Sequence, residues 1–446
     1  MTPRTPVDMR QGATRRARRA LLLLLGVVLL VHLGVAWASR DGLIQDDADS
    51  YVRLGSNLAA GHGFVFEPGR TPTSWRAPGY PVLLAVVFWL TGASLTAARI
   101  VSAFIWTLTT LITYALGRRV VGDRAALLAA ALVGLSPELA GLTGLLWSET
   151  LFTCLFLASV WTIVRWRTDT PSWPAAVAAG ALVGAAVLTR STAVVLFPLL
   201  WFSAFTSAAP RAQIGRTILV TVLGLTILGG WTARNYLLHD QFVLVESNVG
   251  YNLYIGNSPD TPIPFAWQKA ATLAYDERYH AILGGHSKES QNALLARAAL
   301  DYVRENPLRT AALALGKAFD FWLPDFFIAR NVRAGSFGPA YARAWLAVLV
   351  LTVGAYLLVM GMACRHAWAN RWAWSTWFVA LVLILYTVPH MLVYGASRYH
   401  LPLMPLVMIL AAPELLRACQ RVRVGGREPL GRRAGVDAIR CPVPPC

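Results

Sequence analysis

Three carboxylates lie close together just after the first apolar segment of the chain, in the run Asp46-Asp47-Ala48-Asp49-Ser50-Tyr51. A carboxylate held beside an attacking group can accept the proton that this group loses. Arginines further along the chain supply guanidinium groups, whose geometry matches the oxygen atoms of a phosphate. Carboxylates and arginines at the edge of a membrane suit an enzyme that handles a lipid with a phosphate and a polar head group.

The composition indicates a chain embedded in a membrane. Of its 446 residues, 56% are hydrophobic and only 14% are charged, and 17 are Trp. This apolar content exceeds what a soluble core of this length needs. The net charge of +17 comes from short basic clusters beside apolar runs, as expected of cytoplasmic loops, so no nucleic-acid binding is expected. The five cysteines show neither a disulfide framework nor metal-ligand spacing.

The first apolar segment follows the basic run Arg15-Arg16-Ala17-Arg18-Arg19. The positive-inside rule therefore keeps the N-terminus in the cytoplasm and places the acidic cluster outside. A cleaved signal peptide is the alternative interpretation of this segment. Apolar length and arginine placement predict about ten transmembrane helices, with both termini inside. They are expected at residues 20–38, 98–117, 125–142, 150–164, 175–189, 191–205, 217–231, 344–363, 372–388 and 401–416.

Three further segments are expected to lie at the membrane surface. Residues 80–90 are apolar but too short to span a bilayer. Residues 310–327 carry Lys317, Asp320 and Asp325, and a crossing there would put the C-terminal arginines outside. We therefore predict that this segment is interfacial or re-entrant. The amphipathic residues 289–305 are expected to lie along the surface.

The predicted fold class is an all-α polytopic membrane protein, with interfacial helices in the first and the largest extracytoplasmic loops. A basic cytoplasmic tail, residues 1–19, precedes a transmembrane domain at residues 20–416. Its main extracytoplasmic loops are expected at about residues 39–97 and 233–343, and these loops collect most of the unusual polar residues. The active face should thus lie outside, in a protein of the plasma (inner) membrane. A disordered basic cytoplasmic tail is expected at residues 417–446.

Several short motifs, taken in order along the chain, carry a family resemblance. They are the run from Asp47 to Phe64, then Arg76-Ala-Pro-Gly-Tyr-Pro81, Trp147-Ser-Glu-Thr-Leu-Phe152, Arg234-Asn235, the run from Asn248 to Asn257, and Arg398-Tyr-His-Leu-Pro402. Together they resemble the C-type membrane glycosyltransferases of the protein mannosyltransferase and lipid A aminoarabinose transferase kind. The sequence departs from that pattern at Glu149, where many relatives would have an aspartate.

The resemblance implies a polyprenyl-phosphate-linked sugar as donor and an acidic residue in the first external loop. The expected function is inverting transfer of a hexosyl or pentosyl group, on the extracytoplasmic side, to a protein, glycan or lipid acceptor. The alternative is a lipid-linked-sugar flippase or a non-catalytic protein of the cell envelope. A transporter should have ionisable residues near mid-membrane, whereas here they cluster at the outer boundary, which favours the enzyme.

Two carboxylates are the candidate catalytic residues. Asp47 is the candidate general base, since it lies four residues before Tyr51, the spacing that the resembling family has. Its alternative role is to cap the helix that follows. Glu149 is the second candidate: it would orient the acceptor or help to hold a divalent cation with Asp47. Its alternative is favourable charge at a helix N-terminus. No other cofactor is expected, and no metal ligands are assigned.

Four arginines are the candidate clamp for the donor phosphate, namely Arg76, Arg190, Arg234 and Arg398. Guanidinium groups there would stabilise charge on the departing polyprenyl phosphate. The alternative is that these side chains reach toward lipid head groups. The candidate residues for the sugar or acceptor are Tyr51, Asn248, Asn252 and Asn257, because amides bind hydroxyls and aromatic faces stack on sugar rings. An ordered, turn-rich loop is the alternative for residues 248–257.

Overall fold

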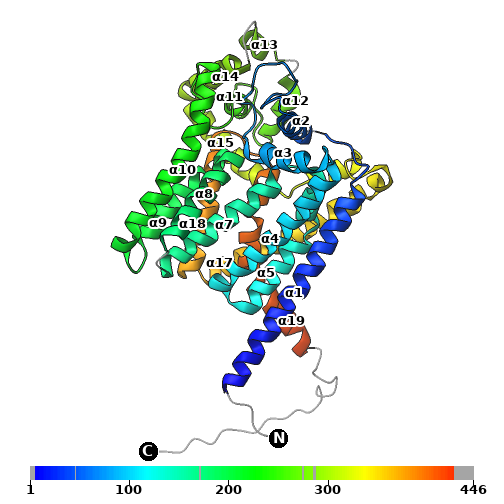
Figure 1. Ribbon diagram of the computed structural model, residues 1–446, viewed down its shortest axis with the longest axis vertical. Helices are drawn as coiled ribbons and strands as arrows, with labels where there is room; N and C mark the ends of the chain where they lie inside the picture. Colours follow the sequence, from blue (N-terminus) through cyan, green and yellow to red (C-terminus); the bar gives the residue numbers. More distant parts are fainter. Residues whose placement is uncertain (1–5, 46, 170–171, 274–275, 285–287, 426–446) are drawn as a thin grey trace, which may run out of the picture.

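The computed structural model describes residues 6–45, 47–169, 172–273, 276–284 and 288–425. All regular secondary structure in these residues is helical, and none of these residues forms a strand. Long helices make up the body of the molecule, and short helices form a lobe at one end of it (Figure 1). The prediction of an all-α, multi-pass membrane protein is confirmed.

Six helical stretches in the described residues are long and apolar enough to cross a membrane. They are Arg16–Ala38 in α1 (Pro6–Ala38), α4 (Leu95–Val121), α10 (Pro210–His239), Pro339–Ala369 in η4 (Pro339–Ala344) and α17 (Trp345–Ala369), α18 (Trp374–Leu392), and Ser397–Arg421 in η5 (Ser397–Leu403) and α19 (Met404–Gly425). A bent pair, α5 (Asp123–Leu135) and α6 (Pro137–Leu145), makes a seventh if it is one span.

The expected count of ten spans is not confirmed. The other three expected spans do coincide with helices, namely α7 (Glu149–Thr168), α8 (Trp173–Thr189), and η1 (Ser191–Val195) followed by α9 (Leu196–Phe205). However, α8 and the η1–α9 stretch are shorter than a full span. In α7, buried polar residues such as Thr150, Thr153 and Ser159 face the interior. Hydrophobicity alone therefore does not mark these segments as spans.

The bend between α5 and α6 sets the position of α7. Ser136 precedes Pro137 and has an extended backbone, the conformation that a residue before proline prefers. The hydroxyl of Ser136 accepts a hydrogen bond from the Leu139 N–H at 3.4 Å, which starts α6 in a new direction, 44° from α5. Left-handed Leu146 ends α6, and α7 begins three residues later at Glu149, whose side chain is buried.

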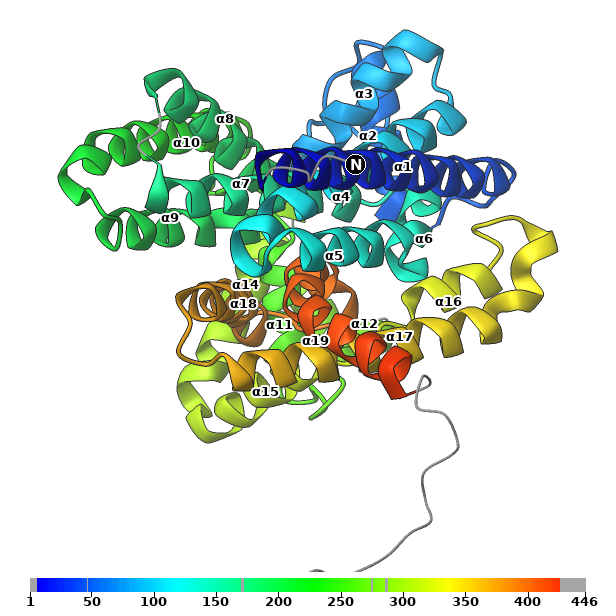
Figure 2. The same cartoon turned by 90° about the horizontal axis from the view of Figure 1, so that it is seen from below.

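The transmembrane core forms around α4, which packs against α1, α5 and α7. Seen from below, α5 lies between α1 and α19 (Figure 2), and α17 packs on the far side of α19. A second group forms around α10, which packs against α8 and α9. Fully buried aromatic side chains, including Trp106, Trp147, Phe152 and Tyr386, fill the interior. These large side chains hold the helix ends that carry the site in fixed positions.

The lobe consists of short helices from both external loops. They are α2 (Asp47–Ala59), α3 (Gly79–Thr91), α11 (Val249–Gly256), α12 (Lys269–Thr272), α13 (Glu277–Leu283), α14 (Lys288–Glu305) and α15 (Pro307–Phe321). The short helix α16 (Phe327–Arg333) lies apart from the lobe and packs against α17 and η4. The short helix predicted at residues 80–90 is present as α3. In the segment 310–327, α15 ends at Phe321, and Asp325 lies in the non-helical stretch before α16. α15 does not qualify as a span by length and composition, and its interfacial or re-entrant position stays a prediction.

Lys317 on α15 fastens the lobe to the membrane domain. Its ammonium group donates hydrogen bonds to the carbonyls of Gly256 and Leu392, both at 3.1 Å, and to Asn257 Oδ1 at 2.9 Å. Any side chain at Gly256 would collide with the Val393 carbonyl, so this close approach requires glycine. Thus α11 and the end of α18 are held together, and both border the site described below.

The C-terminal tail differs in part from its prediction. α19 stays helical through Gly425, whereas a disordered tail was expected from residue 417. Residues 426–446 lie outside the described residues.

Single cysteines in a cysteine-free background test the topology. The N-terminal end of α1 and the C-terminal end of α19 lie at the end of the molecule opposite the lobe (Figure 1). We expect an impermeant thiol reagent to label exposed positions Glu67 and Arg297 in intact cells. Exposed positions Arg124 and Arg371 should react only after permeabilisation. External labelling at position 371 would mean that α15 crosses the membrane.

Candidate active site

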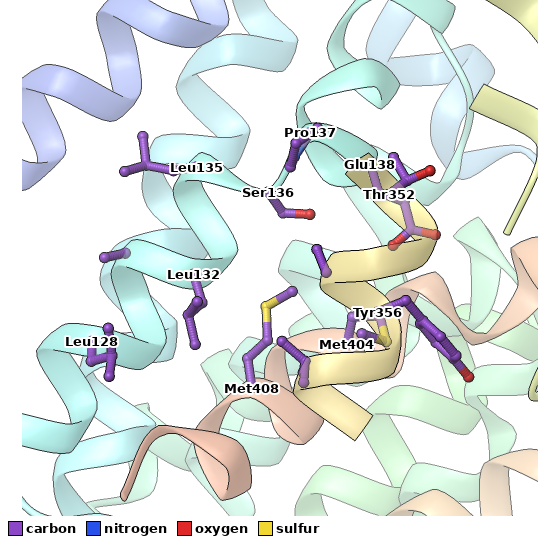
Figure 3. A pocket seen from close by; sticks show the side chains of 13 residues that line it. Leu128, Leu132, Leu135, Ser136, Pro137, Glu138, Thr352, Tyr356, Met404 and Met408 are labelled. Carbon is purple, nitrogen blue, oxygen red and sulfur yellow. The ribbon is translucent and has the colours of Figure 1, made fainter. Parts of the chain in front are cut away.

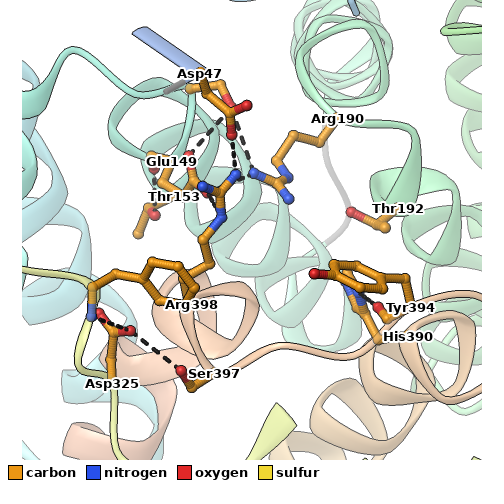
Figure 4. A network of polar contacts seen from close by, with 12 residues as sticks. Asp47, Glu149, Thr153, Arg190, Thr192, Asp325, His390, Tyr394, Ser397 and Arg398 are labelled. Atoms are coloured by element: carbon orange, nitrogen blue, oxygen red, sulfur yellow. Dashed lines mark hydrogen bonds and ion pairs between the residues drawn. The ribbon is translucent and has the colours of Figure 1, made fainter. Parts of the chain in front are cut away.

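Five charged side chains from distant parts of the chain meet where the lobe joins the membrane domain. Four of them, Asp47, Glu149, Arg190 and Arg398, are labelled in Figure 4. Asp47 is the first residue of α2, and Glu149 is the first residue of α7. Arg76 lies in the loop before α3, Arg190 ends α8, and Arg398 lies in η5. All five were predicted as site residues, and the structure brings them together.

Asp47 has a guanidinium group on each carboxylate oxygen. Arg76 Nη2 donates to Oδ1 at 2.5 Å, and Arg398 Nη2 donates to Oδ2. Burial favours the neutral carboxyl, but the charges of Arg398 and Arg76 outweigh it and hold the pKa of Asp47 well below its usual value. Asp47 is therefore ionised. Because both carboxylate oxygens of Asp47 bind arginine, these contacts support an ion-pairing role for Asp47 over the alternative of a helix cap. The neighbouring Asp46 lies outside the described residues.

Glu149 is the second anion of the cluster, and its side chain is only 1% exposed. Arg190 Nη1 lies 2.8 Å from Glu149 Oε1, and Arg398 Nε lies 3.6 Å from the same atom. Arg398 thus bridges the two carboxylates. Three guanidinium groups face two carboxylates, which leaves one positive charge unmatched within the cluster.

Aromatic rings form the walls around this cluster. The guanidinium carbon of Arg398 lies 4.7 Å from the centroid of the Trp147 ring, and that of Arg190 lies 5.0 Å from that of Tyr399. Cations over aromatic faces are stabilised by the ring quadrupole. Burial raises the pKa of Tyr51 to about 12, so its hydroxyl stays protonated and donates to Ser148 Oγ at 3.1 Å. These contacts orient the guanidinium groups before any ligand binds.

A cavity of about 500 Å³ opens beside the cluster. Six of the predicted site residues line it, namely Tyr51, Arg76, Arg190, Asn248, Asn252 and Arg398. Asp47 and Glu149 lie beyond the arginines that line the cavity and are bound to them. The part of the cavity that these arginines line therefore presents positive charge to a ligand, and Asp47 and Glu149 lie directly behind that charge.

Besides Asp47 and Glu149, two other predicted site residues, Arg234 and Asn257, do not line the cavity. Arg234 Nη1 donates to the Thr73 carbonyl at 2.8 Å and to Ser74 Oγ at 3.2 Å. Asn257 is buried, and its amide binds Lys317 and the Leu392 carbonyl. Neither lines the cavity. Their contacts support a role in holding loops in place and give no support for donor or sugar binding.

Several side chains that were not predicted as site residues line the same cavity. They are Ser191, Thr192, Glu246, Asn292, His390, Tyr394 and Tyr399. An ionisable residue near the end of an apolar span, such as His390, was a usable signal. For Glu246, the only signal in the sequence was its position two residues before Asn248, a predicted site residue.

The arrangement of carboxylates gives no set of metal ligands in the part of the chain that the structure describes. No three His, Cys, Asp or Glu side chains are grouped there as ligands for an ion. Asp47 and Glu149, the residues considered for a divalent cation, are bound to arginines.

A second cavity, of about 310 Å³, lies between α5, α17 and α19 (Figure 3). Side chains such as Leu132, Leu135, Met404 and Met408 make its lining mostly apolar, and buried Glu138 lies at its edge. None of the predicted site residues lines it. We therefore assign the candidate active site to the first cavity, the one beside the charged cluster.

Solved structures of an archaeal oligosaccharyltransferase share this fold. The archaeal oligosaccharyltransferase AglB from Archaeoglobus fulgidus, in complex with an inhibitory peptide and a dolichol-phosphate, matches 94% of this chain and 52% of its own, with 16% identity and a TM-score of 0.55. The Archaeoglobus fulgidus oligosaccharyltransferase in complex with Zn and sulfate matches 90% of this chain and 50% of its own, with 15% identity and a TM-score of 0.53. This chain spans about half the length of these relatives. ArnT from Cupriavidus metallidurans, bound to undecaprenyl phosphate, matches 91% of this chain and 79% of its own at 16% identity, with a TM-score of 0.43.

These matches show that the chain has the fold of the oligosaccharyltransferase structures, in agreement with the fold that the sequence resemblance implies. The family model described as dolichyl-phosphate-mannose-protein mannosyltransferase matches residues 75–230 of the chain. That match includes Arg76, Glu149 and Arg190 of the charged cluster. Among proteins of curated function, none matches this sequence.

Proposed function

We propose that the protein is a glycosyltransferase that moves a sugar from a polyprenyl-phosphate donor to an acceptor on the extracytoplasmic side of the membrane. The observation that carries this proposal is the cavity lined by Arg76, Arg190 and Arg398, with Asp47 directly behind two of them. The matching family model is named for a dolichyl-phosphate-mannose donor, and the AglB structure holds a dolichol-phosphate. Both support a lipid-linked donor here.

The donor phosphate binds the three arginines in this proposal. A phosphate diester carries one negative charge, which matches the one positive charge that the cluster leaves unbalanced. Guanidinium groups bind phosphate oxygens with paired, charge-assisted hydrogen bonds. The same groups would stabilise the charge that develops on the departing polyprenyl phosphate. Arg398 contributes most, since it faces the cavity and also bridges Asp47 and Glu149.

Asp47 serves as the general base. When the donor phosphate takes hydrogen bonds from Arg76 and Arg398, these groups stabilise the Asp47 carboxylate less, and its pKa rises toward its usual value. A carboxylate with a higher pKa is a stronger base. The acceptor atom then attacks the anomeric carbon and passes its proton to Asp47. The bond between that carbon and the phosphate oxygen breaks, and the configuration inverts. The leaving phosphate needs no acid.

Comparison of cells with and without the gene tests this function. We expect mass spectrometry of envelope glycans, glycoproteins and glycolipids to show the loss of one hexose-sized or pentose-sized modification. The modification should return with the wild-type gene. Unchanged glycans, together with lipid-linked sugar that accumulates in one leaflet, would contradict the enzyme and favour a flippase.

A further inference from the structure

Two carboxyl groups outside the charged cluster are buried, one on Glu138 in α6 and one on Asp325 just before α16. These residues are only 4% and 2% exposed. Glu138 Oε1 and Asp325 Oδ2 each have no hydrogen-bond partner, and neither residue forms an ion pair with a cation in the part of the chain that the structure describes. Buried polar atoms of this kind are costly unless they are paired, so each of these oxygens needs a partner.

The packing of α6 on α16 brings the two carboxyl groups together. A Cβ at Gly141 would lie 2.8 Å from Ile328 Cγ2, so the two helices are in close contact at this point. Glu138 lies three residues before Gly141 on the same face of α6, and Asp325 lies three residues before Ile328. The two groups are close enough for the charge of Asp325 to act on the Glu138 carboxyl.

The hydroxyl groups beside Glu138 are already used elsewhere. Thr352 and Tyr356 of α17 line the second cavity together with Glu138 (Figure 3). Their hydroxyls donate to main-chain carbonyls, at 2.9 Å and 2.5 Å. The rest of that lining is mostly apolar. The simplest way to satisfy both carboxyl groups is therefore one proton between them, so that one group donates and the other accepts.

The contacts of Asp325 decide which of the two carries the proton. Asp325 Oδ1 accepts from the Phe327 N–H at 3.1 Å and from the Ser397 hydroxyl at 3.3 Å (Figure 4). Such bonds favour an ionised carboxylate, and Glu138 has none of them. Burial raises the pKa of Asp325 to about 6, although these bonds and the charge of Arg398 act in the opposite direction. At neutral pH, Asp325 is thus ionised, and Glu138 keeps its proton and donates it to Asp325 Oδ2.

Asp325 connects this proton to the candidate active site. Ser397, which donates to Asp325, directly precedes Arg398 in η5. We propose that Glu138 and Asp325 share one proton and act as a positioning pair, which holds Ser397 in place and so directs Arg398 toward the large cavity. This inference rests on the proposed function, which places the donor phosphate at Arg398. The shared proton also limits the pair to one negative charge, because a second one would compete with the phosphate for Arg398.

Loss of the shared proton gives the positioning pair a measurable signature. The charged and titratable groups that face the pair are Tyr356 from α17, Arg398 from η5 and Glu149 from α7, and His400 packs on Tyr356. None of them supplies a substitute proton: Tyr356 and His400 bind main-chain carbonyls, and Arg398 binds the carboxylates of the charged cluster. When pH rises far enough to remove the proton, the two carboxylates repel each other. Phosphate affinity should therefore be full near neutral pH and fall as pH rises.

Binding of a phosphodiester to the full-length protein in detergent tests the inference. The probe is isoprenyl methyl phosphate, whose single charge does not change in this range. For the wild type, we expect the dissociation constant to increase about tenfold between about pH 7 and about pH 10. In Glu138→Gln the side-chain amide donates to Asp325 at every pH, so affinity at neutral pH should be kept and the loss at high pH should disappear.

Asp325→Asn tests the other member of the positioning pair. Asparagine keeps an oxygen that accepts from Ser397 but carries no charge, so this variant should also lose the pH dependence. Because both substitutions remove the same repulsion, the double variant should behave like either single variant. If one variant fails to fold, the other alone decides.

Two controls separate the positioning pair from other effects of pH. Burial lowers the pKa of Lys317 to about 8, so the difference between wild type and variant is the readout, not the wild-type profile alone. Glu67→Gln removes an exposed carboxylate outside the large cavity and should keep the wild-type pH dependence. Thermal stability is measured in parallel, since a purely structural role would lower stability without altering the pH dependence of binding.

The outcomes distinguish this inference from the proposed function. The same pH dependence in the wild type, Glu138→Gln and Asp325→Asn would overturn the positioning pair, while binding of the phosphodiester would still support the donor site. Failure of the wild type to bind the phosphodiester at any pH would overturn both.

Discussion

Replacement of Asp47 by asparagine is expected to slow sugar transfer by about 10²- to 10⁴-fold, the range typical for loss of a general base. Asparagine keeps the shape of the side chain and caps a helix about as well, but it cannot take the acceptor's proton. It also removes the anion that Arg76 and Arg398 now bind. We therefore expect isoprenyl phosphate to bind as tightly or more tightly, while turnover falls.

Asp49→Asn is the matched control for this experiment. Asp49 lies two residues further on, is half exposed, and pairs with Arg53 at 3.0 Å on the surface of α2. Exposed pairs of this kind contribute at most about 1 kcal/mol to stability. Single-turnover transfer by Asp49→Asn should match the wild type. Near-normal transfer by Asp47→Asn would refute its role as base. If Asp49→Asn alone were inactive, the mechanism would stand with a different carboxylate.

The convergence of the charged cluster was predictable because it follows from topology. Asp47, Glu149, Arg190 and Arg398 each lie where a helix begins or ends at one boundary of the membrane domain. The positive-inside rule places all of these ends on the same side. Polar groups at one boundary need partners, since burial without them is costly. The sequence therefore indicated which residues meet, although it gave no pairing between them.

Arg234 and Asn257 show where this reasoning fails. Arg234 also lies near the outer end of a predicted span, yet α10 packs on α8 and α9, and its side chain binds the loop at Thr73 and Ser74. Asn257 directly follows α11 and its side chain turns toward Lys317. Such directions depend on how helices rotate and pack. Apolar length and charge patterns contain no information on that rotation.

The lack of information on helix rotation and packing also explains why Glu246 and His390 were not predicted as site residues. Glu246 and His390 come from segments far apart in sequence, and only the packing of α18 against α15 and η1 places His390 in the cavity wall. Composition likewise does not give the number of spans, because α7 buries polar residues and the chain bends at Ser136, between α5 and α6.

Arg398→Lys is expected to weaken isoprenyl phosphate binding by about 10- to 100-fold, as the loss of one or two charge-assisted hydrogen bonds requires. Lysine keeps the charge but has no planar fork, so it cannot contact Asp47, Glu149 and a phosphate together. Arg398→Ala should bind still more weakly. It should also be less stable, because Glu149 is buried and would keep only Arg190.

Arg234→Lys separates loss of the phosphate contact from a general loss of structure. Arg234 is a partly buried arginine with hydrogen bonds of its own, but it does not line the cavity. Its replacement should lower thermal stability and leave phosphate affinity unchanged. An equal loss of affinity in Arg234→Lys and Arg398→Lys would indicate an indirect effect of unfolding. Unchanged affinity in both Arg398→Lys and Arg398→Ala would exclude Arg398 from the phosphate site, and the unmatched positive charge would then belong to Arg76 or Arg190.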